Sequence, residues 1–81
     1  MDTLETTRID ARVDARGLAC PMPIVRTAQA MKALAGGQHL ELLATDPGSA
    51  KDVAAWSRST GNALVEQSMN DGVYRFVLQH K

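Results

Sequence analysis

The stretch Ala15-Arg16-Gly17-Leu18-Ala19-Cys20-Pro21-Met22-Pro23 joins a predicted strand to a predicted helix and carries the only cysteine of the chain. Polar and apolar side chains alternate through residues 8–14, which is the pattern of a half-buried strand. Gly17 ends this strand, and Pro-x-Pro starts a helix, because the first helical turn tolerates proline. With Cys20 as the N-cap and Pro21 as the first helical residue, the positive end of the helix dipole favours the reactive thiolate.

The remainder of the chain alternates between helical and extended patterns. Apolar side chains recur at spacings of three and four over residues 24–35, which predicts an amphipathic helix that ends at Gly36-Gly37. The later predicted elements are a strand at 39–45, a helix from Asp46-Pro47 to Gly61-Asn62, and strands at 63–69 and 73–79 around the tight turn Asn70-Asp71-Gly72. Strands joined through helices run parallel, whereas a hairpin is antiparallel. The sequence therefore predicts an α/β two-layer sandwich, βαβαββ, with two helices on one face of a four-stranded mixed sheet.

The composition limits the number of domains and the kind of partner. The 81 residues suffice for one small domain, which we place at 8–81 behind a flexible N-terminus at 1–7. Nine basic residues balance nine acidic ones, so the chain lacks the basic excess of a nucleic-acid-binding protein. Apolar runs stay well below the roughly 18 residues of a membrane span, and the N-terminus has no apolar secretory core. We therefore expect a cytoplasmic protein without nucleic-acid or membrane partners.

Cys20 is the candidate reactive residue, although a solitary cysteine is most often a small buried hydrophobe. It lies outside the apolar periodicity, and the backbone N–H groups of Met22 and Ile24 are candidate donors to its sulfur or to a group bound to it. A helix end contributes about 0.3–1 kcal/mol. That is less than one pKa unit at about 1.36 kcal/mol per unit, so we expect a modestly lowered pKa. His39 and His80 are scattered, so neither a cysteine–histidine pair nor a metal site is predicted, and no cofactor is expected.

Three basic residues are candidates for electrostatic support of the thiol. Arg16 and Arg26 are the nearest cations in the sequence. Lys51 starts the second helix, and parallel strands would bring that turn to the same end of the sheet as Cys20. The alternative is that all three belong to an ordinary solvated surface. Leu18 and Met22 form either an apolar collar for docking partners or simple packing contacts.

Gly17-Leu18-x-Cys20-Pro21-x-Pro23, after Asp14, resembles the signature of the TusA/SirA-like family of small sulfur-carrier proteins. The resemblance extends from about Ile9 to Gln79 and includes Thr45-Asp46, Asp52-Val53, Gly61 and Tyr74-Arg75-Phe76. It implies that Cys20 accepts sulfane sulfur as a persulfide and passes it to an acceptor protein. The loop implied to support Cys20 comprises Asp14, Arg16, Gly17, Leu18, Pro21, Met22 and Pro23.

The resemblance also implies partners: a donor such as a cysteine desulfurase or rhodanese, and an acceptor sulfurtransferase of the DsrE-like kind. The pathway stays open between tRNA thiolation, cofactor supply and oxidation of sulfur compounds. Many members have proline where this chain has Ala54, and some have a second cysteine near Ser57. Lack of the second cysteine favours a covalent sulfur relay over a two-cysteine redox cycle. The alternative function is a non-catalytic regulatory or interaction module that uses the Cys-Pro-x-Pro loop for docking.

Overall fold

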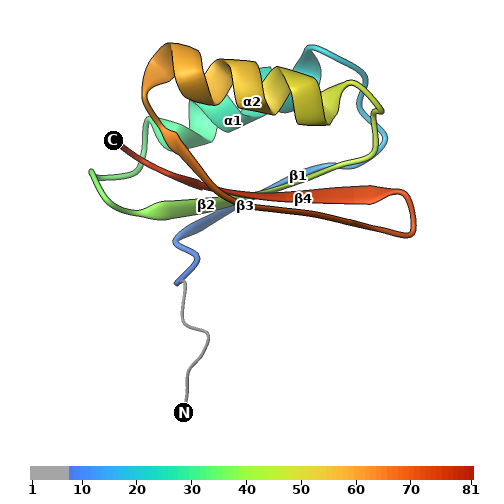
Figure 1. Ribbon diagram of the computed structural model, residues 1–81. Coiled ribbons are helices and arrows are strands. Elements are labelled where there is room, and N and C mark those ends of the chain that lie inside the picture. Colours follow the sequence, from blue (N-terminus) through green and yellow to red (C-terminus); the bar gives the residue numbers. More distant parts are fainter. Residues whose placement is uncertain (1–7) are drawn as a thin grey trace.

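Four strands and two helices follow one another in the predicted order βαβαββ (Figure 1). The computed structural model describes residues 8–81, so the predicted flexible segment 1–7 lies outside the described residues. The elements are β1 (Ala11–Ala15), α1 (Met22–Met31), β2 (His39–Ala44), α2 (Ser49–Thr60), β3 (Ala63–Asn70) and β4 (Val73–Gln79). Within residues 8–81, neither helix is long and apolar enough to cross a membrane.

The strands form one mixed sheet in the order β1-β2-β4-β3, and both helices cover the same face (Figure 1). β1 pairs with β2 in parallel, with Val13 opposite Leu42, while β4 is antiparallel to both β2 and β3. The predicted two-layer α/β sandwich is therefore confirmed. Because β1 and β2 are parallel, the loops that follow them lie at the same end of the sheet, beside the carboxyl ends of the two strands.

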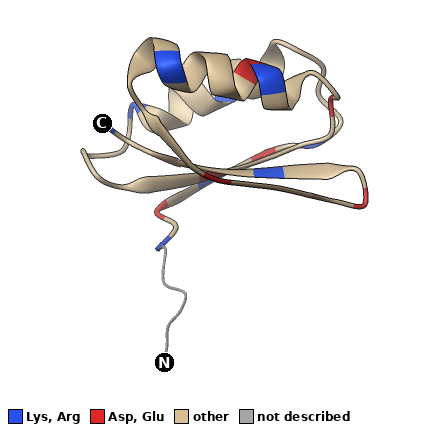
Figure 2. Ribbon diagram, viewed as in Figure 1, with Lys and Arg blue, Asp and Glu red and all other residues tan. Residues whose placement is uncertain are grey.

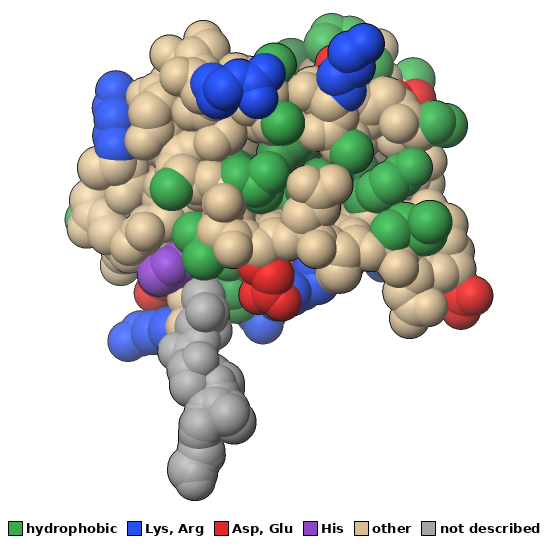
Figure 3. Space-filling model, viewed as in Figure 1, with side chains coloured by type: hydrophobic (Ala, Val, Ile, Leu, Met, Phe, Trp, Pro, Cys, Tyr) green, Lys and Arg blue, Asp and Glu red, His purple; other side chains and the backbone are tan. Residues whose placement is uncertain are grey.

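The core lies between the sheet and the two helices. Every second residue of β2 (Leu40, Leu42 and Ala44) is fully buried, as the sequence alternation predicts. Phe76 and Leu78 of β4 lie opposite this row, and Met31 and Val53 close the core from the helices. On the face seen in Figure 3, hydrophobic side chains gather in a band between the helices and the sheet.

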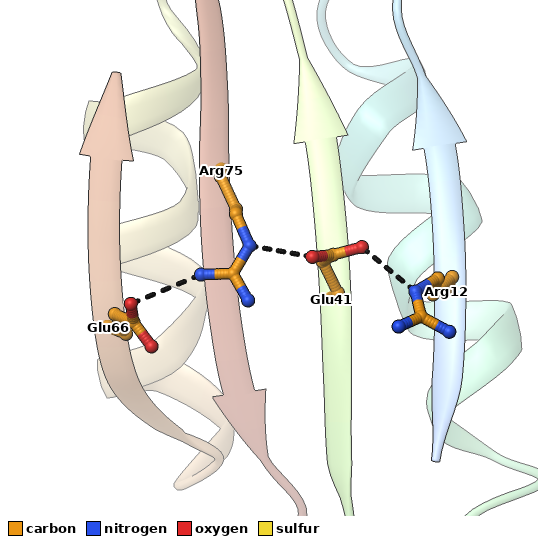
Figure 4. A network of polar contacts seen from close by, with 4 residues as sticks. All are labelled: Arg12, Glu41, Glu66 and Arg75. Carbon is orange, nitrogen blue, oxygen red and sulfur yellow. Dashed lines mark hydrogen bonds and ion pairs between the residues drawn. The ribbon is translucent and has the colours of Figure 1, made fainter. Parts of the chain in front are cut away.

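A row of alternating charges crosses the other face of the sheet (Figure 4). Glu41 accepts from Arg12 Nε at 3.2 Å and from Arg75 Nε at 2.6 Å, and Arg75 Nη1 contacts Glu66 at 3.2 Å. One side chain from each of the four strands takes part, so the row links the strands across the sheet. Elsewhere the basic and acidic residues are scattered over both layers (Figure 2).

Both helices are shorter than the sequence predicts. α1 ends at Met31, four residues before Ala35, because Ala33 and Leu34 donate to carbonyls three residues back in tight turns. α2 begins at Ser49 with Gly48 as its N-cap, not at Pro47. The carboxylate of Asp46 accepts from the N–H of Gly48 at 3.1 Å, which makes a turn before the helix. α2 ends where the sequence predicts, because Gly61 takes the left-handed conformation that terminates a helix.

The position of the core predicts that two truncations of apolar side chains lower the free energy of unfolding by very different amounts. Leu42→Ala removes a fully buried side chain from the central strand β2 and should lower the free energy of unfolding by about 2–5 kcal/mol. Val65→Ala, on the edge strand β3, truncates a side chain that is 48% exposed and should cost about 0.5 kcal/mol or less. Urea unfolding followed by circular dichroism compares the two variants, and equal losses would contradict this placement of the core.

Candidate functional site

Cys20 is exposed in the turn that connects β1 to α1. The helix begins at Met22 with Pro21 as its N-cap, so the predicted cap at Cys20 is wrong by one residue. The N–H of Met22 donates to the Ala19 carbonyl at 2.9 Å, and that of Ile24 to the Pro21 carbonyl at 3.1 Å. These are the two candidate donors to the sulfur, and in the structure backbone carbonyls of the turn accept from both.

A carboxylate, not a cation, is the polar partner of the thiol. Cys20 Sγ donates to Asp52 Oδ2 across 2.8 Å. Asp52 is half-buried in the first turn of α2. This helix starts at the same end of the sheet as the Cys20 loop. A Cβ built on Gly48 would lie 3.1 Å from Asp46 Oδ2 and 3.9 Å from Asp52 Oδ2, so both carboxylates converge on this turn.

These carboxylates raise the pKa of the Cys20 thiol. The largest cause is the hydrogen bond to Asp52, followed by desolvation and by the negative charges of Asp52 and Asp46. Each favours the protonated thiol over the thiolate. The expectation of a modestly lowered pKa is therefore wrong, because it rested on the helix dipole and on nearby cations and did not include the carboxylates of Asp52 and Asp46.

The cations predicted near the thiol are engaged elsewhere or exposed. The Arg16 guanidinium donates two hydrogen bonds of 2.8 Å to the Asp14 carboxylate, and the Arg16 backbone N–H donates to Asp14 Oδ1 at 3.2 Å. These bonds hold the pKa of Asp14 at about 2 and raise the pKa of Arg16. Arg26 and Lys51 are exposed, and within the described chain neither forms a hydrogen bond or ion pair with Cys20. The charges that shift the pKa of the Cys20 thiol are those of Asp52 and Asp46.

The rest of the predicted supporting loop is anchored to the fold. Gly17 has a φ of +82°, which favours glycine, and its N–H donates to Thr45 Oγ1 at 2.9 Å. Leu18 packs against the core and Pro23 is buried in the first turn of α1. These contacts fix the turn against the end of β2.

The predicted apolar collar divides into two parts. Leu18 is half-buried against the core, whereas Met22 is 38% exposed. Val25, one turn further along α1, is also 38% exposed. Residues three apart on a helix share a face, so Met22 and Val25 form a small apolar surface at the start of α1, the helix that follows Cys20. Val25 lies within the apolar periodicity of residues 24–35, and that pattern does not distinguish it from the buried residues of the helix.

Comparison with known proteins places these residues in a family. The sequence model described as sulfurtransferase TusA matches residues 11–80. The putative sulfur carrier protein YrkI of Bacillus subtilis is 51% identical over 70 residues, which cover 86% of this chain and 93% of the relative. The sulfur carrier protein TusA of Allochromatium vinosum is 43% identical over 70 residues, covering 86% and 92% of the two chains.

The fold also has a counterpart among solved structures. The crystal structure of a SirA-like protein from Desulfitobacterium hafniense superposes with a TM-score of 0.76 at 22% sequence identity. The match covers 85% of this chain and 95% of the other. It shows that the two-layer arrangement of four strands and two helices is shared.

The Asp14–Arg16 pair predicts a directly observable titration. In the wild-type protein, the side-chain NMR signals of Asp14 should titrate with a pKa of about 2. Arg16→Gln removes the guanidinium that stabilises the carboxylate, so the midpoint should move up toward the ordinary value of 3.8. Because the folded-state pKa is depressed, any stability from this pair is present above pH 3.8 and is lost toward pH 2.

Arg26→Gln is the matched control, since it removes an exposed guanidinium that makes no hydrogen bond to Asp14 among the described residues. It should leave the Asp14 titration in place. An Asp14 midpoint that does not change in Arg16→Gln would contradict the assignment of the shift to this pair.

Proposed function

This chain belongs to the TusA family, and we propose that it is a sulfur carrier that holds sulfane sulfur as a persulfide on Cys20. The observation that carries the proposal is the exposed Cys20 thiol in the turn before α1, within the Gly-Leu-x-Cys-Pro-x-Pro sequence. An exposed sulfur can meet the sulfur atom of another protein without unfolding of the core.

Loading requires one bond to form and one to break. The Cys20 thiolate attacks the outer sulfur of a donor persulfide, a new bond joins Sγ to that sulfur, and the donor leaves as a thiolate. Cys20 gives up its proton to water before the attack, and the departing donor thiolate can take up a proton in turn. The transferred sulfur keeps its oxidation level, so the step consumes no external electrons.

Discharge repeats the same chemistry in the other direction. The thiolate of an acceptor attacks the outer sulfur, and Cys20 leaves as a thiolate that takes up a proton. The sequence contains no second cysteine, so no thiol of this chain can attack the persulfide within the same molecule. Sulfur bound to Cys20 therefore passes to another molecule, which is the behaviour of a carrier.

We propose that both partners are proteins: a donor of the cysteine desulfurase or rhodanese class, and an acceptor sulfurtransferase. The support is the exposed apolar surface of Met22 and Val25 at the start of α1, which begins two residues after Cys20. A partner that covers these side chains removes apolar area from water next to the reacting sulfur. Sulfur transfer between persulfide and thiol then takes place at the interface between the two proteins.

The proposal predicts that sulfur uptake depends on Cys20. Wild-type protein treated with a persulfide-charged rhodanese should gain the mass of one or more sulfur atoms, and a reductant should remove them. Cys20→Ser keeps an exposed side chain of similar shape but lacks the sulfur nucleophile, so it should gain no mass. Mass spectrometry of the intact protein measures this outcome, and circular dichroism verifies the fold.

A second variant tests whether any exposed thiol would serve. Cys20→Ser combined with Ser59→Cys moves the single cysteine to an exposed position of α2, away from the Pro-x-Pro turn. It should take up much less sulfur than the wild type from the charged protein. Equal loading, or sulfur uptake by Cys20→Ser alone, would contradict the assignment. If Cys20→Ser instead takes up no sulfur but retains partner binding and full cellular activity, the docking-module alternative is the correct one.

A further inference from the structure

The contact between Cys20 and Asp52 has no part in the loading and discharge of sulfur. We propose that Asp52 restrains Cys20, so that the empty thiol reacts slowly with small electrophiles and the carried sulfur is lost slowly to small thiols. The inference rests on the proposed carrier function for the loaded state. For the empty state it concerns only the reactivity of the thiol.

The geometry holds Asp52 against the sulfur from a fixed position. Its backbone N–H donates to the Gly48 carbonyl at 3.1 Å, inside the first turn of α2. The Cys20 loop is fixed in turn by the bond from Gly17 to Thr45 at 2.9 Å. The hydrogen bond of 2.8 Å from Cys20 Sγ to Asp52 Oδ2 thus joins two anchored segments that are 32 residues apart.

The charges around Cys20 are the reverse of those around an activated cysteine. Activated thiols lie beside lysine, arginine or histidinium, or at a helix N-terminus that donates to the sulfur. Here Asp52 faces the thiol from α2 and Asp46 acts on it from the preceding turn. Arg16, in the same loop as Cys20, is neutralised by Asp14. A thiolate at this position would lose its hydrogen bond to Asp52 and meet two like charges.

Both reactions of Cys20 are slowed by this environment, for different reasons. The empty residue attacks as a thiolate, and a raised pKa leaves less thiolate at neutral pH. In the loaded state, a small thiolate attacks the outer sulfur, its bond to that sulfur forms as the Sγ–S bond breaks, and Cys20 leaves as a thiolate. A leaving thiol with a raised pKa departs more slowly.

A graded set of variants tests the restraint on the empty thiol. Asp52→Asn keeps the shape of the side chain, removes its charge and offers an amide N–H to the thiolate. Asp46→Asn removes the second charge while its amide oxygen can still accept from Gly48. Asp71→Asn, in the β3–β4 turn, is the control, because asparagine tolerates its φ of +52°.

The rate of alkylation of Cys20 by iodoacetamide, followed against pH by mass spectrometry, should rank these variants. Asp52→Asn should react fastest at neutral pH and Asp46→Asn less fast, while Asp71→Asn should match the wild type. The thiolate fraction rises about tenfold for each unit by which the pKa falls. Thiolate nucleophilicity falls by a part of this, so the net gain is about threefold per unit. Equal rates in Asp52→Asn and Asp71→Asn would overturn the proposal.

The loaded state is tested with glutathione as the small thiol. Each variant is charged with sulfur, freed of the donor, and followed by mass spectrometry as the added mass disappears. Asp52→Asn should lose sulfur severalfold faster than Asp71→Asn, and equal loss would overturn the restraint on carried sulfur. A wild-type protein that takes up no sulfur would refute the carrier function, while the alkylation ranking would still judge Asp52. Circular dichroism verifies each fold, and if Asp52→Asn does not fold, a rate unchanged in Asp46→Asn counts against the proposal.

Discussion

The parallel pairing of β1 with β2 is the constraint on which the rest of the site depends. It sets Ala15 beside Ala44, so the two loops that lead into the helices leave the sheet at the same end. The Cys20 turn and the start of α2 are then neighbours, although 32 residues separate Cys20 from Asp52. An antiparallel pairing would place these loops at opposite ends of the sheet, and the thiol would have only its own helix for a partner.

The sequence was a good guide to the fold because its signals are local. Alternation through β1 and β2, the left-handed Gly61 after α2 and the Asn-Asp-Gly turn each depend on residues close in the chain. Together these signals are compatible with few topologies, since crossovers between parallel strands are right-handed. Helix ends were less predictable. Asp46 has the residue type of an N-cap, but its side chain caps the Gly48 N–H of a turn that precedes the helix.

The site was less predictable because it depends on the rotation of one helix relative to another. Parallel strands did bring the start of α2 to the thiol, as expected. Neighbouring helical residues point about 100° apart, so a one-residue difference decides whether a lysine or an aspartate faces Cys20. Lys51 is exposed and Asp52 contacts the sulfur. The same limit applies to Arg16, whose charge looks free in the sequence but is paired with Asp14 in the fold.

A sulfur carrier must expose its cysteine to partners and still keep it from unwanted reactions. Burial would also raise the pKa of a thiol and slow its chemistry, but it would hide the sulfur from the acceptor. A carboxylate beside an exposed thiol separates these two effects, because it suppresses the thiolate without covering the sulfur. The half-buried Asp52 next to the exposed Cys20 has this arrangement. The apolar surface of Met22 and Val25 lies on the helix that follows the thiol, so a partner can cover the site from that side and exclude water during transfer.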